Sequence, residues 1–152
     1  MREDFKIRRA VLDDAEIIAK YNILMAEETE SKRLDFNVIF DGVKNLMKMS
    51  NYGFYVVAEV NGEIAGTLMI TYEWSDWRNG LFYWIQSVYV HPDFRRKGVF
   101  KGMYKYVEKI AADDQKSCGL RLYVESGNHQ ARKTYKNLGM KETSYRLYEY
   151  IF

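Results

Sequence analysis

The sequence has one cysteine and one proline in 152 residues, and it has no long apolar run. Cys118 has no second cysteine with which to form an intrachain disulfide, which is typical of a reducing compartment. A membrane-spanning helix needs about 20 apolar residues, and the chain has no such stretch. Its first residues also lack the apolar region of a signal peptide. We therefore expect a cytoplasmic protein with no membrane partner.

The chain also lacks a strong charge of either sign, with 23 Lys and Arg against 21 Asp and Glu. A dedicated nucleic-acid binder usually carries a clear basic excess, so we expect no nucleic-acid partner. No repeat, linker or Cys/His cluster interrupts the sequence, which argues against a metal site. With 47% apolar residues, the chain can bury a core of ordinary size. We predict a single domain over residues 1–152.

The first half of the chain reads as a strand, two helices and three further strands. Residues 5–10 form the first strand, and Asp13 with Glu16 predicts a capping box for the first helix. Apolar residues at helical spacing continue this helix to Met25 and predict a second over 38–47. Strands follow over 54–60, 63–72 and 81–90. The pairs Asn61-Gly62 and Asn79-Gly80 precede the last two, and such pairs favour tight hairpin turns.

The second half alternates helices and strands after Pro92. A helical pattern runs from Val99 to Ile110, a buried strand covers 120–124, and a last helix ends at Gly139. Residues 140–151 are predicted to form a closing strand. A strand, a helix and a strand in succession imply a parallel pair joined by a right-handed crossover. The predicted class is mixed α/β, with a mostly antiparallel sheet, one parallel β-α-β junction and helices on both faces.

The segment from Val88 to Phe100 carries the clearest chemical signal. A strand ends, a basic turn follows, and a helix begins at about Gly98. The first turn of a helix has unpaired N–H groups and a partial positive charge, so it can hold a phosphate group. The basic residues around it are Arg95, Arg96, Lys97 and Lys101. The turn is therefore a candidate diphosphate site, although four basic residues can also simply solvate a turn.

This segment resembles the acetyl-CoA motif Q/R-x-x-G-x-G/A of the GNAT N-acetyltransferases. Arg95 stands at the first position and Gly98 at the glycine, whereas Phe100 replaces the usual small residue. A second element resembles the family's N-x-x-A-x-x-x-Y-x-x-x-G, with Asn128, Ala131, Tyr135 and Gly139 in place. The resemblance implies the GNAT fold over nearly the whole chain. It also implies acetyl-CoA as cosubstrate and no metal.

The same resemblance implies roles for individual residues. The CoA diphosphate would rest on backbone amides from Arg96 through Lys101, including those of Gly98, Val99 and Phe100. The pantetheine arm would pair with the backbone of Val88, Tyr89 and Val90, and the Val90 N–H would polarise the thioester carbonyl. Asn128 would contact the CoA arm or cap the last helix. Tyr135 would protonate the departing thiolate; without the resemblance it reads as a core aromatic.

The general base and the acceptor remain open. Many relatives use a carboxylate on the strand that here carries Trp84 and Gln86, neither of which is a base. The alternatives are a water chain or a carboxylate from a wider set: Glu27, Glu28, Glu30, Asp35, Glu73, Asp76 and Glu125. Acidic residues together with Trp74 and Trp77 favour a cationic acceptor, through charge and cation–π contact. The two tryptophans could instead pack at a homodimer interface.

The resemblance thus predicts an acetyl-CoA-dependent N-acetyltransferase. An amine of a small molecule or peptide would attack the thioester directly. Two other functions stay open. The absent strand carboxylate and Phe100 are compatible with a module that binds acyl-CoA without turnover. A nucleic-acid accessory domain depends only on the basic turn and the aromatic residues.

Overall fold

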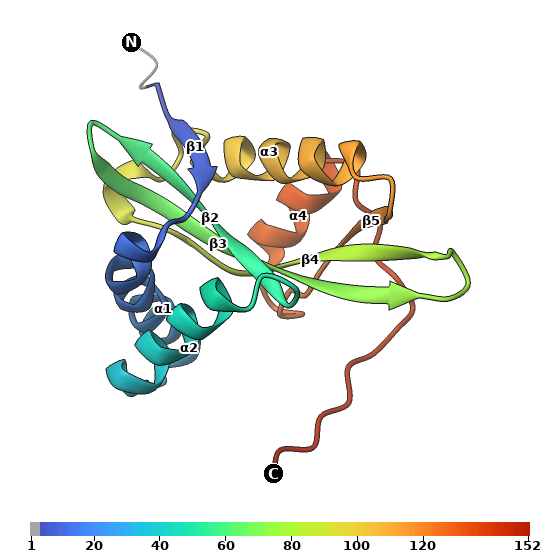
Figure 1. Cartoon of the computed structure of the whole chain (residues 1–152), viewed down its shortest axis with the longest axis horizontal. Coiled ribbons are helices and arrows are strands. Elements are labelled where there is room, and N and C mark those ends of the chain that lie inside the picture. The colour runs from blue at the N-terminus through green and yellow to red at the C-terminus, as the bar shows by residue number, and fades with distance from the viewer. Residues whose placement is uncertain (1–3) are drawn as a thin grey trace. The chain divides into compact units, whose positions relative to one another are not determined.

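The computed structural model describes residues 4–152, and its contacts divide the chain into two compact units, Met1–Leu122 and Tyr123–Phe152. Each unit is described by itself. The first unit contains a five-stranded sheet in the order β1-β2-β3-β4-β5 (Figure 1). Its strands are β1 Lys6–Arg9, β2 Gly53–Val60, β3 Glu63–Ser75, β4 Gly80–Val90 and β5 Ser117–Leu122. The first three neighbouring pairs are antiparallel, and β4 pairs with β5 in parallel.

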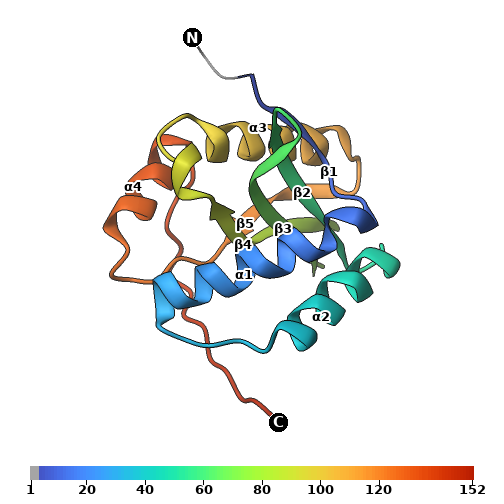
Figure 2. The same cartoon turned by 90° about the vertical axis from the view of Figure 1, so that its left-hand side faces the viewer.

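Helices cover both faces of this sheet, as Figures 1 and 2 show. The helices α1 Ala15–Glu30 and α2 Phe36–Lys48 bury Ile18 and Val43 against Tyr55 and Val57 of β2. On the opposite face, α3 Val99–Asp113 buries an apolar stripe that includes Met103. The predicted mixed α/β class, the parallel β4–β5 junction and the helices on both faces are confirmed.

The two predicted hairpin turns differ in the structure. Asn61 and Gly62 both have positive φ, 49° and 82°, as a tight two-residue turn between β2 and β3 requires. The second turn is longer, because β3 continues to Ser75 and only Asn79 has a positive φ. Gly80 is instead required by close packing, since a Cβ there would lie 2.9 Å from the Cβ of Cys118. The sequence pattern identified the turn but gave it the wrong geometry.

The start of α1 also departs from the prediction. A short 3-10 helix, Leu12–Asp14, precedes α1, and no capping box forms between Asp13 and Glu16. Asp14 is the buried acid here: its carboxylate accepts the Val11 N–H at 2.8 Å and two hydrogen bonds from Arg8, at 2.7 and 3.1 Å. Burial alone would raise the pKa of Asp14, but these hydrogen bonds outweigh it and lower the pKa below its ordinary value.

The second unit contains one helix, α4 His129–Asn137. Gly139, with φ 92°, ends it as predicted: its N–H donates to Lys136 and the Met140 N–H donates to Tyr135, both carbonyls of the last turn. The predicted closing strand over 140–151 is wrong, because these residues are described and have no strand pairing. Among the residues that the structure describes, no helix is long and apolar enough to cross a membrane.

Candidate functional site

The C-terminal end of β4 has an open edge. The parallel pairing between β4 and β5 stops at Ile85 and Leu122, whereas β4 continues to Val90 beside β3. Between these points Ser87 adopts φ 51°, and the register passes from Gln86–Met69 to Tyr89–Thr67. One extra residue is therefore inserted in β4, which makes a β-bulge. A bulge bends the strand that carries it, and here it marks the place where β4 continues without β5.

The backbone of Val90 faces this open edge. The His91 N–H donates to the Ala65 carbonyl of β3 at 2.9 Å, so the peptide groups of His91 point toward β3. Successive residues of a strand direct their N–H groups to alternate sides, so the Val90 N–H and carbonyl point away from β3. The Val90 carbonyl there accepts the Arg95 Nε–H at 2.8 Å. The Val90 N–H thus points to the side on which an added strand or a thioester carbonyl could pair.

The loop that follows β4 presents backbone N–H groups beside this edge. Two residues of the loop have left-handed backbone conformations, Arg96 with φ 62° and Gly98 with φ 85°. Gly98 also precedes α3, and no side chain caps the helix there. Successive N–H groups in such a conformation form a concave anion-binding surface at the positive end of the helix. This arrangement is suited to a diphosphate.

Gly66 brings α3 close to the end of β4. It lies opposite Val90 in the β3–β4 ladder, and a Cβ on it would lie 3.0 Å from Val99 Cγ1 and 3.2 Å from Met103 Cε. A side chain at this position would crowd α3, so Val99 and Met103 would have to shift by a few tenths of an ångström. Phe100, the departure from the family motif, has its ring centroid 6.2 Å from that of Tyr104, one turn further along α3.

The basic side chains of the loop do not all have the same surroundings. Arg96, Lys97 and Lys101 are exposed, and Lys97 Nζ lies 5.5 Å from the Phe94 ring centroid. Arg95 is instead engaged by the protein itself. Its Nη2 donates to Glu28 Oε2 at 2.7 Å, in addition to the Nε contact with Val90. The positive charge of Arg95 is therefore directed toward α1.

Asn128 and Tyr135 belong to the second unit. The Asn128 side chain accepts the Ala131 N–H at 3.1 Å, so the predicted helix cap is confirmed. Tyr135 is half-buried on α4, and burial raises the pKa of its hydroxyl above the ordinary value. The Tyr135 hydroxyl is protonated at neutral pH, as it would also be at the ordinary tyrosine pKa of about 10.

Several of the candidate bases have other partners. Glu28 is held by Arg95, Glu73 forms an ion pair with Arg121, and Asp35 caps α2 by accepting the Val38 N–H at 3.0 Å. Glu30 lies 3.5 Å from Lys32 Nζ. These four carboxylates thus already have cationic or N–H partners.

Two parts of the predicted acceptor site, the tryptophans Trp74 and Trp77 and the acidic end of α1, lie at opposite ends of β4. Trp74 and Trp77 lie at the β3–β4 turn and are 58% and 85% exposed. Glu28 contacts Tyr89 and Arg95 at the other end of β4. At about 3.3 Å per residue, a strand as long as β4 puts roughly 30 Å between these ends. The tryptophans and Glu28 therefore do not form a common site.

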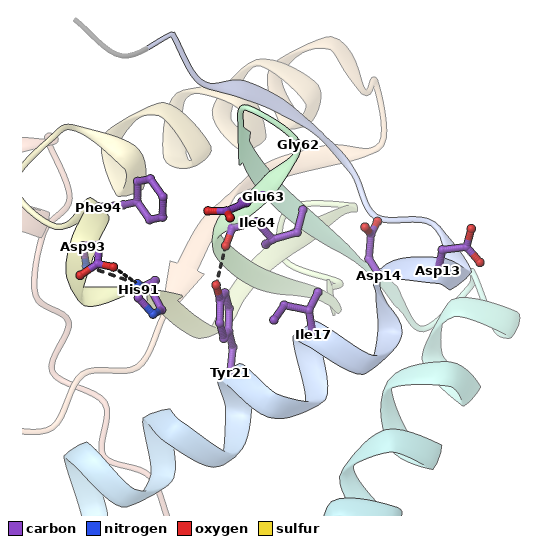
Figure 3. Close-up of a pocket in the computed structure, with 10 residues that line it drawn as sticks. All are labelled: Asp13, Asp14, Ile17, Tyr21, Gly62, Glu63, Ile64, His91, Asp93 and Phe94. Carbon is purple, nitrogen blue, oxygen red and sulfur yellow. Dashed lines mark hydrogen bonds and ion pairs between the residues drawn. The ribbon is translucent and has the colours of Figure 1, made fainter.

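A pocket of about 480 Å³ lies beside the same loop but contains none of the predicted site residues (Figure 3). Its lining comes from the start of α1, the start of β3 and the residues after β4: Asp13, Asp14, Ile17, Tyr21, Gly62, Glu63, Ile64, His91, Asp93 and Phe94. The Tyr21 hydroxyl donates across it to the Ile64 carbonyl at 2.5 Å. The acidic lining is unsuited to a diphosphate, so the open edge of β4 is the better candidate for the cosubstrate. No group of three or more His, Cys, Asp or Glu side chains in residues 4–152 is arranged to hold a metal ion.

Two features of the site were missed by the sequence analysis. One is the bulge at Ser87, because nothing in an aromatic strand sequence marks a serine with positive φ. The other is the contact of Glu28 with both Tyr89 and Arg95, at 3.2 and 2.7 Å. Glu28 was one of several acidic candidates, and no spacing rule pairs it with a residue 67 positions later.

Comparisons with known proteins agree with this geometry. The model of the acetyltransferase (GNAT) family matches residues 17–140. A crystal structure of "a possible acetyltransferase" from Clostridium difficile 630 is 47% identical, covers 97% of each chain and superposes with a TM-score of 0.91. A predicted acetyltransferase with acetyl-CoA from Clostridium acetobutylicum has the same fold, with a TM-score of 0.78 at 20% identity over 97% of this chain and 96% of its own.

A curated relative aligns over a shorter stretch. The thialysine N-epsilon-acetyltransferase of Bos taurus is 32% identical over 96 residues, which are 57% of this chain and 55% of the relative. The alignment therefore spans about half the length of that protein.

Proposed function

Because this chain belongs to the acetyltransferase (GNAT) family, we propose that it transfers the acetyl group of acetyl-CoA to a primary amine. The observation that carries the proposal is the open edge of β4 next to the loop 91–98. The edge offers a backbone for the pantetheine arm at Val88–Val90. The left-handed residues Arg96 and Gly98 lie in the loop just before α3, and backbone of this kind can form an anion-binding concavity. Both features suit a molecule with an amide-containing arm and a diphosphate.

The chemistry that we propose is a direct attack. The amine nitrogen forms a bond with the thioester carbon, and the developing oxyanion accepts a hydrogen bond from the Val90 N–H. A preorganised donor of this kind contributes about 2.7–4 kcal/mol to transition-state stabilisation. The C–S bond then breaks, and the leaving thiolate takes the proton of the Tyr135 hydroxyl. The resulting phenolate regains a proton from the newly acylated nitrogen, which becomes the neutral amide. A tyrosine with the ordinary pKa of about 10 is already protonated at neutral pH. Burial raises the pKa of Tyr135 further, which keeps the hydroxyl protonated but does not make it a stronger acid.

For the amine proton we propose a water-mediated route. An alkyl ammonium has a pKa near about 10.4 and must lose a proton before it can attack. Glu28, Glu30, Glu73 and Asp35 have cationic or N–H partners of their own, which makes each a poor candidate for a direct base. Water can enter the open edge beside β4 and remove the proton.

The acceptor class that we propose is a small cationic amine. The last turn of α1 carries Glu27, Glu28 and Glu30, and its Glu28 lies at the end of β4. The bovine relative is named for acetylation of the ε-nitrogen of thialysine, an amine acceptor. Turnover with only neutral or anionic acceptors would contradict this part of the proposal.

A second candidate function is an acyl-CoA-binding module without turnover. The observation that favours it is that four of the seven candidate carboxylates, Glu28, Glu30, Glu73 and Asp35, have other partners. Both functions are tested by isothermal titration calorimetry with CoA and acetyl-CoA, followed by free-thiol release from acetyl-CoA with a panel of amines. Turnover with at least one amine supports the enzyme. Tight binding with no turnover across the panel supports the module, and no binding of either ligand overturns both.

A further inference from the structure

The segment after α4 leaves many apolar side chains in solvent. The structure describes residues 141–152 and assigns them neither helix nor strand (Figure 1). Six large apolar side chains of this segment are each at least 69% exposed: Tyr145, Leu147, Tyr148, Tyr150, Ile151 and Phe152. So dense a group of exposed apolar side chains is uncommon on a soluble protein and marks an interaction surface.

The composition of this segment is typical of a β-strand. Tyrosine, isoleucine and phenylalanine favour the extended conformation. The rings of Tyr150 and Phe152 lie with their centroids 5.7 Å apart, in keeping with residues i and i+2 on one side of an extended chain. An extended segment without a ladder partner is a template for pairing with another strand.

We propose that residues 143–152 pair with the same residues of a second copy, as antiparallel strands around a twofold axis between Leu147 and Tyr148. This register puts Arg146 of each copy opposite Glu149 of the other, and Tyr145 opposite Tyr150. Opposite charges and aromatic pairs at directly facing positions both stabilise a two-stranded ladder. A twofold axis also lets one sequence serve as both partners of the interface.

Charge complementarity selects this register over its neighbours. A shift of two residues puts Arg146 opposite Leu147 in one direction and opposite Ile151 in the other. Either shift leaves Arg146 and Glu149 without their opposite charge. The segment is therefore complementary to itself in a single antiparallel register. This interface is independent of the acyl transfer proposed above.

Two charge reversals test the register directly. Arg146→Glu gives each copy two acidic residues in the ladder, and Glu149→Arg gives each copy two basic residues. In sedimentation velocity across the micromolar to millimolar range, we expect the parent to dimerise and each single variant to dimerise at least about tenfold more weakly. An equimolar mixture of the two variants should associate like the parent, because the acidic and basic strands are then complementary. The double variant should also dimerise like the parent.

Lys141→Glu is the matched control, because it reverses a charge in the same segment outside the paired residues. It should leave the dimer unchanged. At concentrations too low for the parent to dimerise, circular dichroism and the melting temperature should be the same for all variants, since the substituted side chains are exposed. A parent that stays monomeric overturns the proposal. Dimers that persist in both single variants, or a mixture that does not associate, overturn it as well and indicate that another surface joins the copies.

Discussion

The carboxylate of Glu28, near the end of α1, holds the guanidinium of Arg95, with Oε2 2.7 Å from Nη2. Glu28 also accepts the Tyr89 hydroxyl at 3.2 Å, and Arg95 donates its Nε–H to the Val90 carbonyl at 2.8 Å. These three contacts join α1, the end of β4 and the loop 91–98. Arg95 is the first residue of the family motif, and its side chain, although 45% exposed, contacts both Glu28 and the Val90 carbonyl. We infer that Arg95 stabilises the conformation of the loop by linking it to α1; this contact is called the brace below.

A double-mutant cycle on this pair tests the brace. If Arg95 acts through Glu28, then Glu28→Gln and Arg95→Ala should each weaken acetyl-CoA binding, by up to about fivefold for a partly exposed ion pair. The double variant should bind no more weakly than either single variant, because both changes remove the same interaction. Calorimetry measures all four dissociation constants.

The control for this cycle is Glu16→Gln, which removes an exposed ion pair with Lys20 on the same helix and should leave the affinity unchanged. Tighter binding in Glu28→Gln would contradict the brace, because it would mean that a released Arg95 reaches the phosphates. The inference would also be contradicted if the changes in binding free energy of the two single variants simply added up in the double variant.

Gly98→Ala should weaken both folding and cosubstrate binding. Nothing lies within 4 Å of the added Cβ, so the cost comes from the backbone, which has φ 85°. An L-residue in this conformation costs about 1–2 kcal/mol of unfolding free energy, and relief of that strain would turn the loop amides away from the diphosphate. Urea unfolding and calorimetry report the two effects. Gly42→Ala, within α2 and also without close neighbours, should instead stabilise by about 0.5–1 kcal/mol.

Tyr135→Phe should lower kcat while leaving the dissociation constant of acetyl-CoA within about twofold of the parent. Loss of a general acid typically costs about 10²–10⁴ in rate. Because burial raises the pKa of Tyr135, the parent rate should hold through neutral pH and fall only in the strongly alkaline range. The variant should lack this alkaline limb. Equal kcat values and equal pH profiles would show that Tyr135 is not the acid.

Asp14→Asn should destabilise the fold at neutral pH by about 2 kcal/mol, because it removes a charged hydrogen-bond partner from Arg8 and from the Val11 N–H. The pKa of Asp14 is lowered in the folded state. The stabilisation is therefore present above the unfolded pKa of about 3.9 and is lost as the pH falls through the folded value. Urea unfolding from pH 7 downward should show the difference between parent and variant shrinking below about pH 4. A difference independent of pH would exclude the ionised carboxylate as its source.

Local signals in the sequence predicted much of the fold correctly. Asn61-Gly62 gave a tight turn because both residues tolerate positive φ, and Asn128 and Gly139 gave the ends of α4 because capping depends on neighbouring residues. The order β2-β3-β4 followed from two short turns, and the β4–β5 neighbourhood followed from the single helix α3 between them. Each of these features depends on residues close together in the chain.

Two predictions were wrong because an interaction that the local pattern does not encode decided the structure. Asp13 and Glu16 match a capping box, but Arg8 and the Val11 N–H engage Asp14 and a 3-10 turn begins the helix. The apolar pattern of 140–151 predicts a strand, yet a strand forms only where a neighbouring strand supplies its hydrogen bonds. The composition of that segment indicates a propensity for the strand conformation, but it does not identify a strand with which the segment could pair.

By itself, the sequence determined the mixed sheet with its parallel junction and the glycine turn before α3, because these follow from periodicity and from residues adjacent in the chain. The family was indicated by the resemblance of two short motifs to those of known members. Only the tertiary structure decided that β4 continues past β5 through a bulge at Ser87, that Val90 turns its N–H to the open edge, and that Glu28 meets Arg95. The physical reason is distance along the chain. Contacts between residues tens of positions apart depend on how the sheet twists and how helices pack on it, and no local pattern records that geometry.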